Sequence, residues 1–384
     1  MRKTITARHL TSADRTIEFP RIEVDDDGMI LSIDAGEPTT DETTLTSSFL
    51  DIHIHGAMNH DVMQATASGF NEINCFLASR GVGHYLATTV TAPAEETLRS
   101  LERIAKEIES AESRSNLGCA TPIGIHLEGP FISHIKRGVH PPEDILAPDI
   151  ALFDRFQDAA GGHIRLMTAA PELEGGLELI EHATKQGVRV SLGHTNAVAA
   201  EANAAIAKGA ASATHLFNAM RPLDHREPGV VGVVLANDEM FAELICDGIH
   251  VAPEMVEVFL RCKGLGKAIL VTDGMSATGM GDGTFTLGNF NVVVKDGRAM
   301  ARGVLAGSVL TLDQAVANFA RFTKTPFAEV TRAASRNPAV MLGLEERFAI
   351  APGKAANFNR FAADGTLIET LLMGEAVASA ALSA

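Results

Sequence analysis

The sequence contains no tryptophan and one tyrosine, and aromatic residues make up only 5% of its 384 positions. Aliphatic side chains must therefore fill most of the core. With 46% hydrophobic and 21% charged residues, the composition is that of a folded globular protein rather than a disordered chain. Long apolar segments are also absent, since no run approaches the roughly 18 residues of a membrane-spanning helix. No apolar run as long as that of a signal peptide follows the start MRKTITARHL. We therefore expect a cytoplasmic protein with no membrane partner.

Positive charge is scarce in this chain. Lys and Arg number 32 against 48 Asp and Glu, for a formal net charge of −16 and a pI of about 5.3. So acidic a protein is repelled by nucleic-acid backbones and anionic membranes, and we expect neither as a partner. A small phosphorylated molecule can still bind where a few donors gather.

Cysteine is rare and scattered. The four cysteines, Cys75, Cys119, Cys246 and Cys262, form neither a CxxC pair nor a dense framework. Such usage is typical of reduced thiols that serve as small packing residues. We expect no disulfide.

The length indicates one large domain with a small companion, because a (β/α)₈ barrel with its helices takes about 250 residues. Residues 1–47 contain short β-like runs such as TIEFPRIEV and GMILSIDAG, broken by acidic and glycine-containing turns. The last alternating segment, IETLLMGEAV, is expected to return to this sheet. We therefore predict a small β unit from residues 1–47 and 346–384, and a larger unit at 48–345.

Eight short apolar runs alternate with Ala- and Glu-rich helical stretches in the larger unit. The predicted strands are 49–56, 84–91, 122–129, 164–172, 188–195, 212–218, 242–248 and 268–274. Eight such units predict the α/β class and a TIM-type (β/α)₈ barrel. Polar residues close these runs, and the carboxyl ends of barrel strands meet at one mouth, where active sites gather.

Two of these strands end in candidate metal ligands. In DIHIHG, His53 and His55 alternate along the strand and so point to the same side, as two ligands of one ion must. In HLEGPF, Glu128 is followed by glycine and proline, which stop the strand and hold the carboxylate at the rim. Taken alone, each motif is also compatible with a half-buried strand or a solvated glutamate.

Three further strand ends complete the set. His194 in LGHTNA and His215 in THLFNAM each offer one ring nitrogen to a cation such as Zn²⁺. Asp273 in VTDGM is placed to take a proton from metal-activated water. Separately, the histidines could be hydrogen-bonded core residues and Asp273 a helix cap. Their conjunction at the ends of an eight-strand pattern favours a catalytic metal site.

The motifs together resemble the N-acetylglucosamine-6-phosphate deacetylase family of the amidohydrolase superfamily. FLDIHIHG, HLEGPF, KRGVHPP, LGHTNA, THLFNAM, HREPGVVG, DGIHV, VTDGM and LAGS carry the resemblance across nearly the whole chain. It implies a barrel flanked by a small β-sandwich formed by both chain ends. It also implies a homodimer and one or two divalent ions per subunit, zinc or iron.

The resemblance also implies roles for individual residues. Glu128, His194 and His215 match the family's metal ligands, Asp273 matches its catalytic aspartate, and His53 with His55 matches only members that hold a second metal. The implied substrate contacts are Val139, His140, Asn218, Ala219, Arg226, Asp247, Gly248, Ile249, His250, Leu305, Ala306 and Gly307. Arg226 and His250 are the expected phosphate binders, helped by the backbone N–H groups of Asn218 and Ala219.

The implied reaction is metal-dependent deacetylation of a phosphorylated amino sugar. Two alternatives stay open: the same chemistry on N-acetylgalactosamine 6-phosphate or another N-acyl substrate such as an N-acylated amino acid, and an inactive barrel kept as a binding module. The second alternative predicts lost ligands, whereas every candidate ligand and Asp273 is present.

Overall fold

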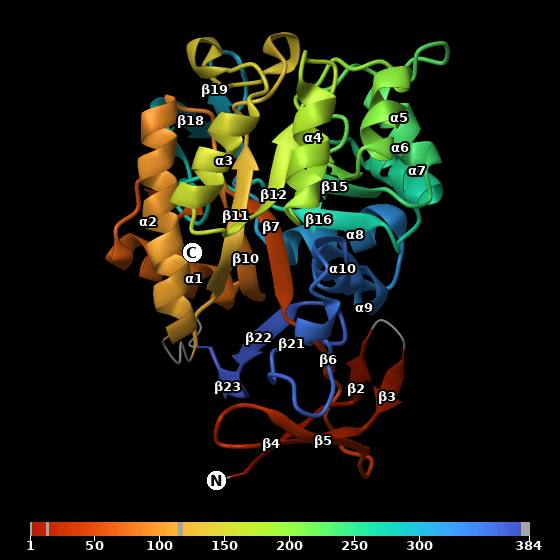
Figure 1. The fold of residues 1–384 in the computed structure, drawn as a ribbon. Coiled ribbons are helices and arrows are strands. Elements are labelled where there is room, and N and C mark those ends of the chain that lie inside the picture. The colour runs from red at the N-terminus through yellow and green to blue at the C-terminus, as the bar shows by residue number, and fades with distance from the viewer. Residues whose placement is uncertain (1, 13–14, 114–117, 378–384) are drawn as a thin grey trace.

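The structure, a computed structural model that describes residues 2–12, 15–113 and 118–377, is built around one parallel eight-stranded sheet (Figure 1). Its strands follow one another in chain order: β7 (Phe49–Ile54), β10 (Val82–Thr89), β11 (Thr121–Glu128), β12 (Ile164–Ala169), β13 (Arg189–Leu192), β14 (Ala210–Ala213), β15 (Phe241–Ile245) and β16 (Ala268–Val271). Each of the eight strands predicted from the sequence is present, and the expected fold class is confirmed.

A helix follows each barrel strand and covers the outside of the sheet. The eight are α1 (Ala67–Ser79), α2 (Ala94–Ser113), α3 (Ile150–Ala159), α4 (Gly176–Lys185), α5 (Ala199–Ala207), α6 (Gly229–Ala236), α7 (Pro253–Lys263) and α8 (Leu312–Thr323). In α2 the buried residues Leu101, Ile104 and Ile108 recur at the helical period, which turns one apolar stripe toward the sheet. The main core fills the space between helices and strands and the barrel interior.

The barrel closes between its first and last strands. The backbone N–H of Asp273 donates to the carbonyl of His53 (2.9 Å), and that of His55 donates to the carbonyl of Gly274 (2.7 Å). The buried carboxylate of Asp51 accepts the hydroxyl of Thr272 at 2.6 Å across the same seam. Burial raises the pKa of Asp51 to about 7. Closure therefore brings His53, His55 and Asp273 together, although more than 200 residues of sequence separate them.

Two small sheets, one from the N-terminal segment alone and one from both ends of the chain, lie at the opposite end of the barrel from β18 and β19 (Figure 1). One contains β1 (Lys3–Thr6), β4 (Pro20–Val24) and β5 (Ile30–Ala35). The other contains β2 (His9–Thr11), β3 (Thr16–Glu18), β6 (Thr44–Ser47), β21 (Phe358–Phe361), β22 (Leu367–Leu372) and β23 (Glu375–Ala376). Ile22 and Val24 of the first share a core with Phe358 and Leu371 of the second, so the predicted return of IETLLMGEAV to the N-terminal sheet is confirmed.

A third sheet is inserted between β16 and α8. It is an antiparallel meander of β17 (Gly283–Leu287), β18 (Phe290–Lys295), β19 (Arg298–Ala301) and β20 (Val304–Leu305) with its own small core. The remaining short elements are β8 (Gly56–Ala57), β9 (His60–Asp61), η1 (His134–Lys136), η2 (Pro142–Asp144), α9 (Phe327–Val330), η3 (Thr331–Ala334), α10 (Arg336–Leu342) and η4 (Glu345–Arg347).

The expectation about the cysteines is wrong for one pair. Cys75 and Cys119 form a disulfide, with Cα atoms 4.5 Å apart, whereas Cys246 and Cys262 are free. The two residues are 44 positions apart, and they meet only because α1 packs beside the segment that enters β11, so no local spacing indicates the pairing. The cysteines therefore no longer support a reducing compartment. Within the described ranges, the helices are too short or too polar to cross a bilayer.

Candidate metal centre

The cavities differ sharply in chemistry. One, about 670 Å³, lies between the N-terminal hairpin and the α9–α10 region, and its lining contains no histidine. Another, about 560 Å³ beside residues 146–152, also contains no histidine in its lining. A smaller one, about 290 Å³, opens at the carboxyl ends of the barrel strands and is lined by four of the five candidate ligands, His55, Glu128, His194 and His215, together with Asp273. Composition rather than size therefore identifies this smaller cavity as the candidate site.

Strands β7 and β11 place three ligands at their carboxyl ends. Every residue of β7 is buried, and His53 and His55 project into the barrel mouth from its end. Glu128 is the last residue of β11. Gly129 then takes φ +77°, and a Cβ atom there would collide with Thr91 Oγ1. Glycine is therefore required to turn the chain directly behind the carboxylate.

Three other site residues lie in the left-handed backbone region. His194 has φ +46°, His215 φ +28° and Asp273 φ +51°. Non-glycine residues rarely adopt this conformation, and such strain persists where surrounding contacts enforce it, commonly at functional sites. Each of the three follows the end of a barrel strand, and the unusual φ turns its side chain back over the mouth.

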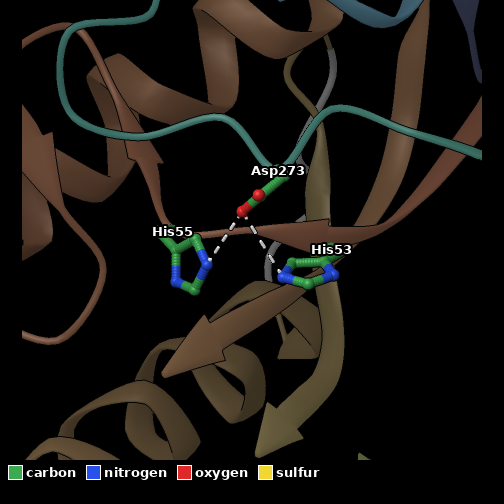
Figure 2. A group of neighbouring side chains, drawn as sticks. All are labelled: His53, His55 and Asp273. Carbon is green, nitrogen blue, oxygen red and sulfur yellow. Dashed lines mark ion pairs between the residues drawn. The ribbon is translucent and has the colours of Figure 1, made fainter. Parts of the chain in front are cut away.

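The candidate ligands form two groups of three. His53, His55 and Asp273 make one, and Glu128, His194 and His215 make the other, with the ligand atoms of each group within 4.8 Å of one another. Figure 2 shows Asp273 Oδ1 facing both rings of the first group, at 3.1 Å from His55 Nε2 and 3.5 Å from His53 Nε2.

Glu128 lies between the two groups. One oxygen is 3.4 Å from His53 Nε2 and 3.2 Å from His215 Nε2, and the other is 3.3 Å from His55 Nε2. His194 Nε2 and His215 Nε2 approach to 3.1 Å. So many ligand atoms converging on so small a volume fit one or two divalent cations.

The second ring nitrogens explain why Nε2 faces the centre. His55 Nδ1 donates to the Thr88 carbonyl and His194 Nδ1 to the Lys136 carbonyl, both at 3.1 Å. His53 Nδ1 donates to the Glu243 carboxylate at 3.1 Å. Because each acceptor holds a proton on Nδ1, Nε2 is the nitrogen left to bind a metal, which imidazole does through an unprotonated nitrogen.

The ionisation of the cluster also favours a cation. Burial acts to lower the pKa of His55, but hydrogen bonds to Asp273 and Glu128 raise it to about 9. Burial acts to raise the pKa of Glu128, and the facing imidazoles hold it well below its ordinary value. Without an ion, the buried carboxylates thus retain protons on their neighbours, and a divalent cation supplies the same positive charge.

Seven of the expected substrate contacts line the cavity: Val139, His140, Asn218, Ala219, His250, Leu305 and Gly307. Ala306 is fully buried behind them. Asp247 Oδ2 accepts a hydrogen bond from Nδ1 of His250 at 2.6 Å. Asp247 Oδ1 accepts hydrogen bonds from the backbone N–H groups of Ile249 and His250. Asp247, Gly248 and Ile249 do not line the cavity, and Asp247 orients His250.

Two groups expected to bind phosphate are not presented to the cavity of this chain, and their phosphate roles stay predictions. Arg226 is exposed and outside the cavity lining, and its backbone N–H donates to Asp224 Oδ1. The backbone N–H of Asn218 is also unavailable, since it donates to the carbonyl of His215 at 3.0 Å in the turn after β14.

Sequence reasoning missed two kinds of contact. Glu243 lies in the middle of β15 and contacts His53. The sequence feature that could have indicated this contact is a single acidic residue inside the apolar run FAELI. Leu287 and Val304 of the inserted sheet form part of the cavity wall. Nothing in their sequence indicates this, because the contact depends on how the sheet folds over the barrel.

The chain forms a (β/α)₈ barrel with a cluster of histidines and carboxylates at its mouth, and its sequence matches a known protein family. The profile of the amidohydrolase family matches residues 44–377, and the chain belongs to this family. Within it, the chain is 38% identical over 335 residues to N-acetylglucosamine-6-phosphate deacetylase of Bacillus subtilis (strain 168), covering 87% of this chain and 84% of that enzyme.

Two further relatives cover almost the whole chain. N-acetylgalactosamine-6-phosphate deacetylase of Escherichia coli O157:H7 is 35% identical over 362 residues, 93% of this chain and 94% of the relative. The structure of a Mycobacterium smegmatis N-acetyl-D-glucosamine-6-phosphate deacetylase variant in complex with N-acetyl-D-glucosamine-6-phosphate superimposes with a TM-score of 0.91 at 31% identity, covering 98% and 99% of the two chains.

Proposed function

We propose that this protein hydrolyses the acetamide of N-acetyl-D-glucosamine 6-phosphate to D-glucosamine 6-phosphate and acetate, with help from a divalent metal. The observation that carries the proposal is the convergence of Glu128, His194 and His215 with Asp273 in one cavity. Relatives with this activity match most of the chain. The complete ligand set disfavours an inactive binding module.

The metal would be held by Glu128, His194 and His215, with His53, His55 and Asp273 available for a second ion. When bound, a divalent ion polarises the acetyl carbonyl and lowers the pKa of water. Histidine and carboxylate donors suit zinc and iron alike, so either ion fits this donor set.

Asp273 is the proposed proton carrier. Burial acts to raise its pKa, but the imidazoles of His53 and His55 hold it below its ordinary value, so the carboxylate is ionised and able to accept a proton. It would take this proton from the attacking water and return it to the amide nitrogen, since an amide anion is a very poor leaving group. The products are acetate and the free amine.

His140 is the proposed donor to the acetyl oxygen. Its Nδ1 accepts the backbone N–H of Thr91 at 3.3 Å and lies 2.7 Å from the Thr91 hydroxyl. Burial, reinforced by the neighbouring His194, holds its pKa well below the ordinary value. The neutral ring therefore carries its proton on Nε2, inside the cavity. A fixed donor there can stabilise negative charge that develops on the carbonyl oxygen.

The phosphate is assigned to His250. The His250 ring donates from Nδ1 to Asp247 Oδ2 and lines the cavity, where as an imidazolium it would donate from Nε2 to a phosphate oxygen. Val139, Asn218, Ala219, Leu305 and Gly307 would surround the sugar. Phosphate binding far from the reacting amide holds that amide in place, so removal of the phosphate should lower turnover as well as affinity.

The test is acetate release by purified protein supplied with Zn²⁺ or Fe²⁺. We expect turnover of N-acetyl-D-glucosamine 6-phosphate and a fall of about 10²–10⁴-fold in kcat for Asp273→Asn. Substrate without the phosphate should react poorly. No acetate above the level of Asp273→Asn under either metal would contradict the proposal.

A second candidate substrate is the galactosamine epimer, because the Escherichia coli O157:H7 relative is an N-acetylgalactosamine-6-phosphate deacetylase. The two sugars differ only in the orientation of one hydroxyl. Comparison of kcat/KM on the two phosphorylated epimers decides between them, and a higher value for the galactosamine compound would replace the first candidate.

Three further features belong to the proposal. We propose a small domain of residues 1–47 and 346–384 beside a catalytic domain of residues 48–345, a homodimer, and a cytoplasmic location. The shared core of the two terminal sheets supports the small domain. Sedimentation of the purified protein tests the dimer.

A further inference from the structure

Glu243 is a buried acid in the centre of the barrel. It lies on β15, whose five residues are all buried, and its own exposure is 0%. A carboxylate is rarely buried so completely unless it is paired, because loss of its hydration is costly. Its position beneath the mouth, rather than in it, separates it from the candidate ligands themselves.

Its contacts reach both ligand groups. Glu243 Oε2 is 3.1 Å from Nδ1 of His53 and 3.2 Å from the backbone nitrogen of His215. The Glu243 carbonyl also accepts the backbone N–H of Leu216 at 2.8 Å. One residue therefore holds the ring of a ligand from the first group and the backbone of a ligand from the second.

The contact with His53 fixes the form of its ring. A carboxylate oxygen can only accept, so Nδ1 must carry a proton, and Nε2 is left as the nitrogen that can bind a cation. His53 Nε2 is buried without a hydrogen-bond partner in the described part of the chain, and it faces Glu128 and Asp273 at 3.4 and 3.5 Å.

The contact with His215 supports a strained backbone. His215 has φ +28°, which a non-glycine residue keeps only if neighbouring contacts enforce it. The Glu243 side chain and main chain bind two successive N–H groups at this point, those of His215 and Leu216. They hold the turn that aims the His215 ring at Glu128.

Glu243 also differs from the supports of the other ligands. His55 and His194 donate from Nδ1 to neutral backbone carbonyls. His53 alone among these three donates to a charged group. A charged acceptor draws the Nδ1 proton more strongly and makes Nε2 a better electron donor to a cation.

We propose that Glu243 is a positioning residue shared by the two ligand groups: it sets the ring state of His53 and the backbone of His215, so that both groups bind metal together. Its side chain does not line the cavity that would hold the substrate. The inference rests on the proposed metal-dependent function, but metal binding can be measured without substrate.

Two substitutions separate charge from hydrogen bonding. Glu243→Gln preserves size and an acceptor oxygen but removes the charge, whereas Glu243→Leu removes both. Ser212→Ala is the matched control, because Ser212 is equally buried on the adjacent strand β14 and its hydroxyl has no partner within the described ranges.

The primary readout is Zn²⁺ affinity, measured by competition with a chromophoric chelator. Loss of such an outer contact typically weakens metal binding about 10–100-fold, so we expect about tenfold for Glu243→Gln, more for Glu243→Leu, and no change for Ser212→Ala. NMR of ¹⁵N-labelled histidine should show the His53 Nδ1 proton signal in the wild type and its loss or shift in Glu243→Leu.

Kinetics at saturating metal give a second readout. We expect kcat to fall while KM for N-acetyl-D-glucosamine 6-phosphate stays within about twofold, because Glu243 acts on the ligands and not on the sugar. Affinity within about threefold of wild type for Glu243→Gln overturns the proposal, and this variant decides alone if Glu243→Leu does not fold. A wild type that binds Zn²⁺ but releases no acetate would sink the proposed function and leave this inference standing.

Discussion

At the scale of single residues, the site depends on which nitrogen of each imidazole holds the proton. His55 and His194 are fixed by backbone carbonyls and His53 by Glu243, so their Nε2 atoms face the centre. His140 has the reverse arrangement, because Thr91 donates to its Nδ1. The same residue type thus serves as a ligand in one place and as a hydrogen-bond donor in another.

This difference predicts the effect of removing His140. In His140→Leu the acetyl oxygen would lose a donor that strengthens as charge develops, so kcat should fall about 10²–10³-fold with a much smaller change in KM. Val139→Ala, which removes only apolar contact from the same cavity wall, should change KM more than kcat. Steady-state kinetics of both variants check this, and a His140→Leu effect confined to KM would contradict it.

His84 gives a pH-dependent prediction away from the metal. Its ring packs against Phe348 with centroids 4.9 Å apart, and burial, together with the charge of Arg347, lowers its pKa to about 3. The native state therefore keeps the ring neutral while the unfolded chain protonates below about pH 6.5, so stability is complete above that pH and is lost as pH falls toward 3.

The measurement is the free energy of unfolding at pH 7 and pH 5. Between them the wild type should lose up to about 2 kcal/mol through His84, a loss that His84→Gln should not show. His225→Gln is the control, since the His225 side chain is 73% exposed. Equal pH dependence in wild type and His84→Gln would show that His84 has no such role.

At the scale of elements, the sequence predicted strands well and loops poorly. The strands follow from apolar runs of the right length, and the ligands at their ends follow from the geometry common to such barrels. Loop conformation instead depends on contacts distant in sequence. Arg226 is exposed outside the cavity of this chain, and the N–H of Asn218 is used within a local turn, so the phosphate contacts of both stay predictions. The inserted sheet was recognised as β structure, yet its place in the cavity wall depends on packing that no local pattern records.

The turn that joins this sheet to the barrel offers a test of one close contact. Gly307 has φ +60°, and a Cβ there would lie 3.0 Å from the carbonyl oxygen of Asp273. Gly303, in the same hairpin, has φ +82° with open space around it. Alanine at either position costs about 1–2 kcal/mol of backbone strain. Only in Gly307→Ala does the new Cβ atom also make a close steric contact with the carbonyl oxygen of Asp273.

We therefore expect similar thermal stability for the two variants and a clearly lower kcat for Gly307→Ala, because displacement of Asp273 by a fraction of an ångström weakens proton transfer. Circular dichroism melts and acetate-release rates provide the comparison. Equal kcat in both variants would mean that the LAGS turn does not position Asp273.

At the scale of the whole molecule, the fold gathers ligands from five strands and closes the barrel around them. The order of strands could be predicted because neighbours in sequence are neighbours in the sheet. The Cys75–Cys119 disulfide and the role of Glu243 could not, since both depend on side chains meeting across separate elements. Sequence patterns indicate where a strand ends, whereas which side chains support its last residue depends on the packed molecule.

Buried ligands from so many strands should make the stability of the whole protein depend on metal. The native state offers the assembled groups and the unfolded chain does not, so an ion that binds the native state stabilises it by RT ln(1 + [M]/Kd). At a hundredfold excess of free metal over Kd this is about 2.7 kcal/mol, or a rise of about 3 °C in Tm for a chain of this length. Glu128→Gln, which alters the carboxylate between the two groups, should melt at a temperature that responds little to metal. Calorimetry of chelator-treated and Zn²⁺-loaded protein measures the shift, and an identical Tm for both forms of the wild type would mean that the ligands do not bind the ion as one site.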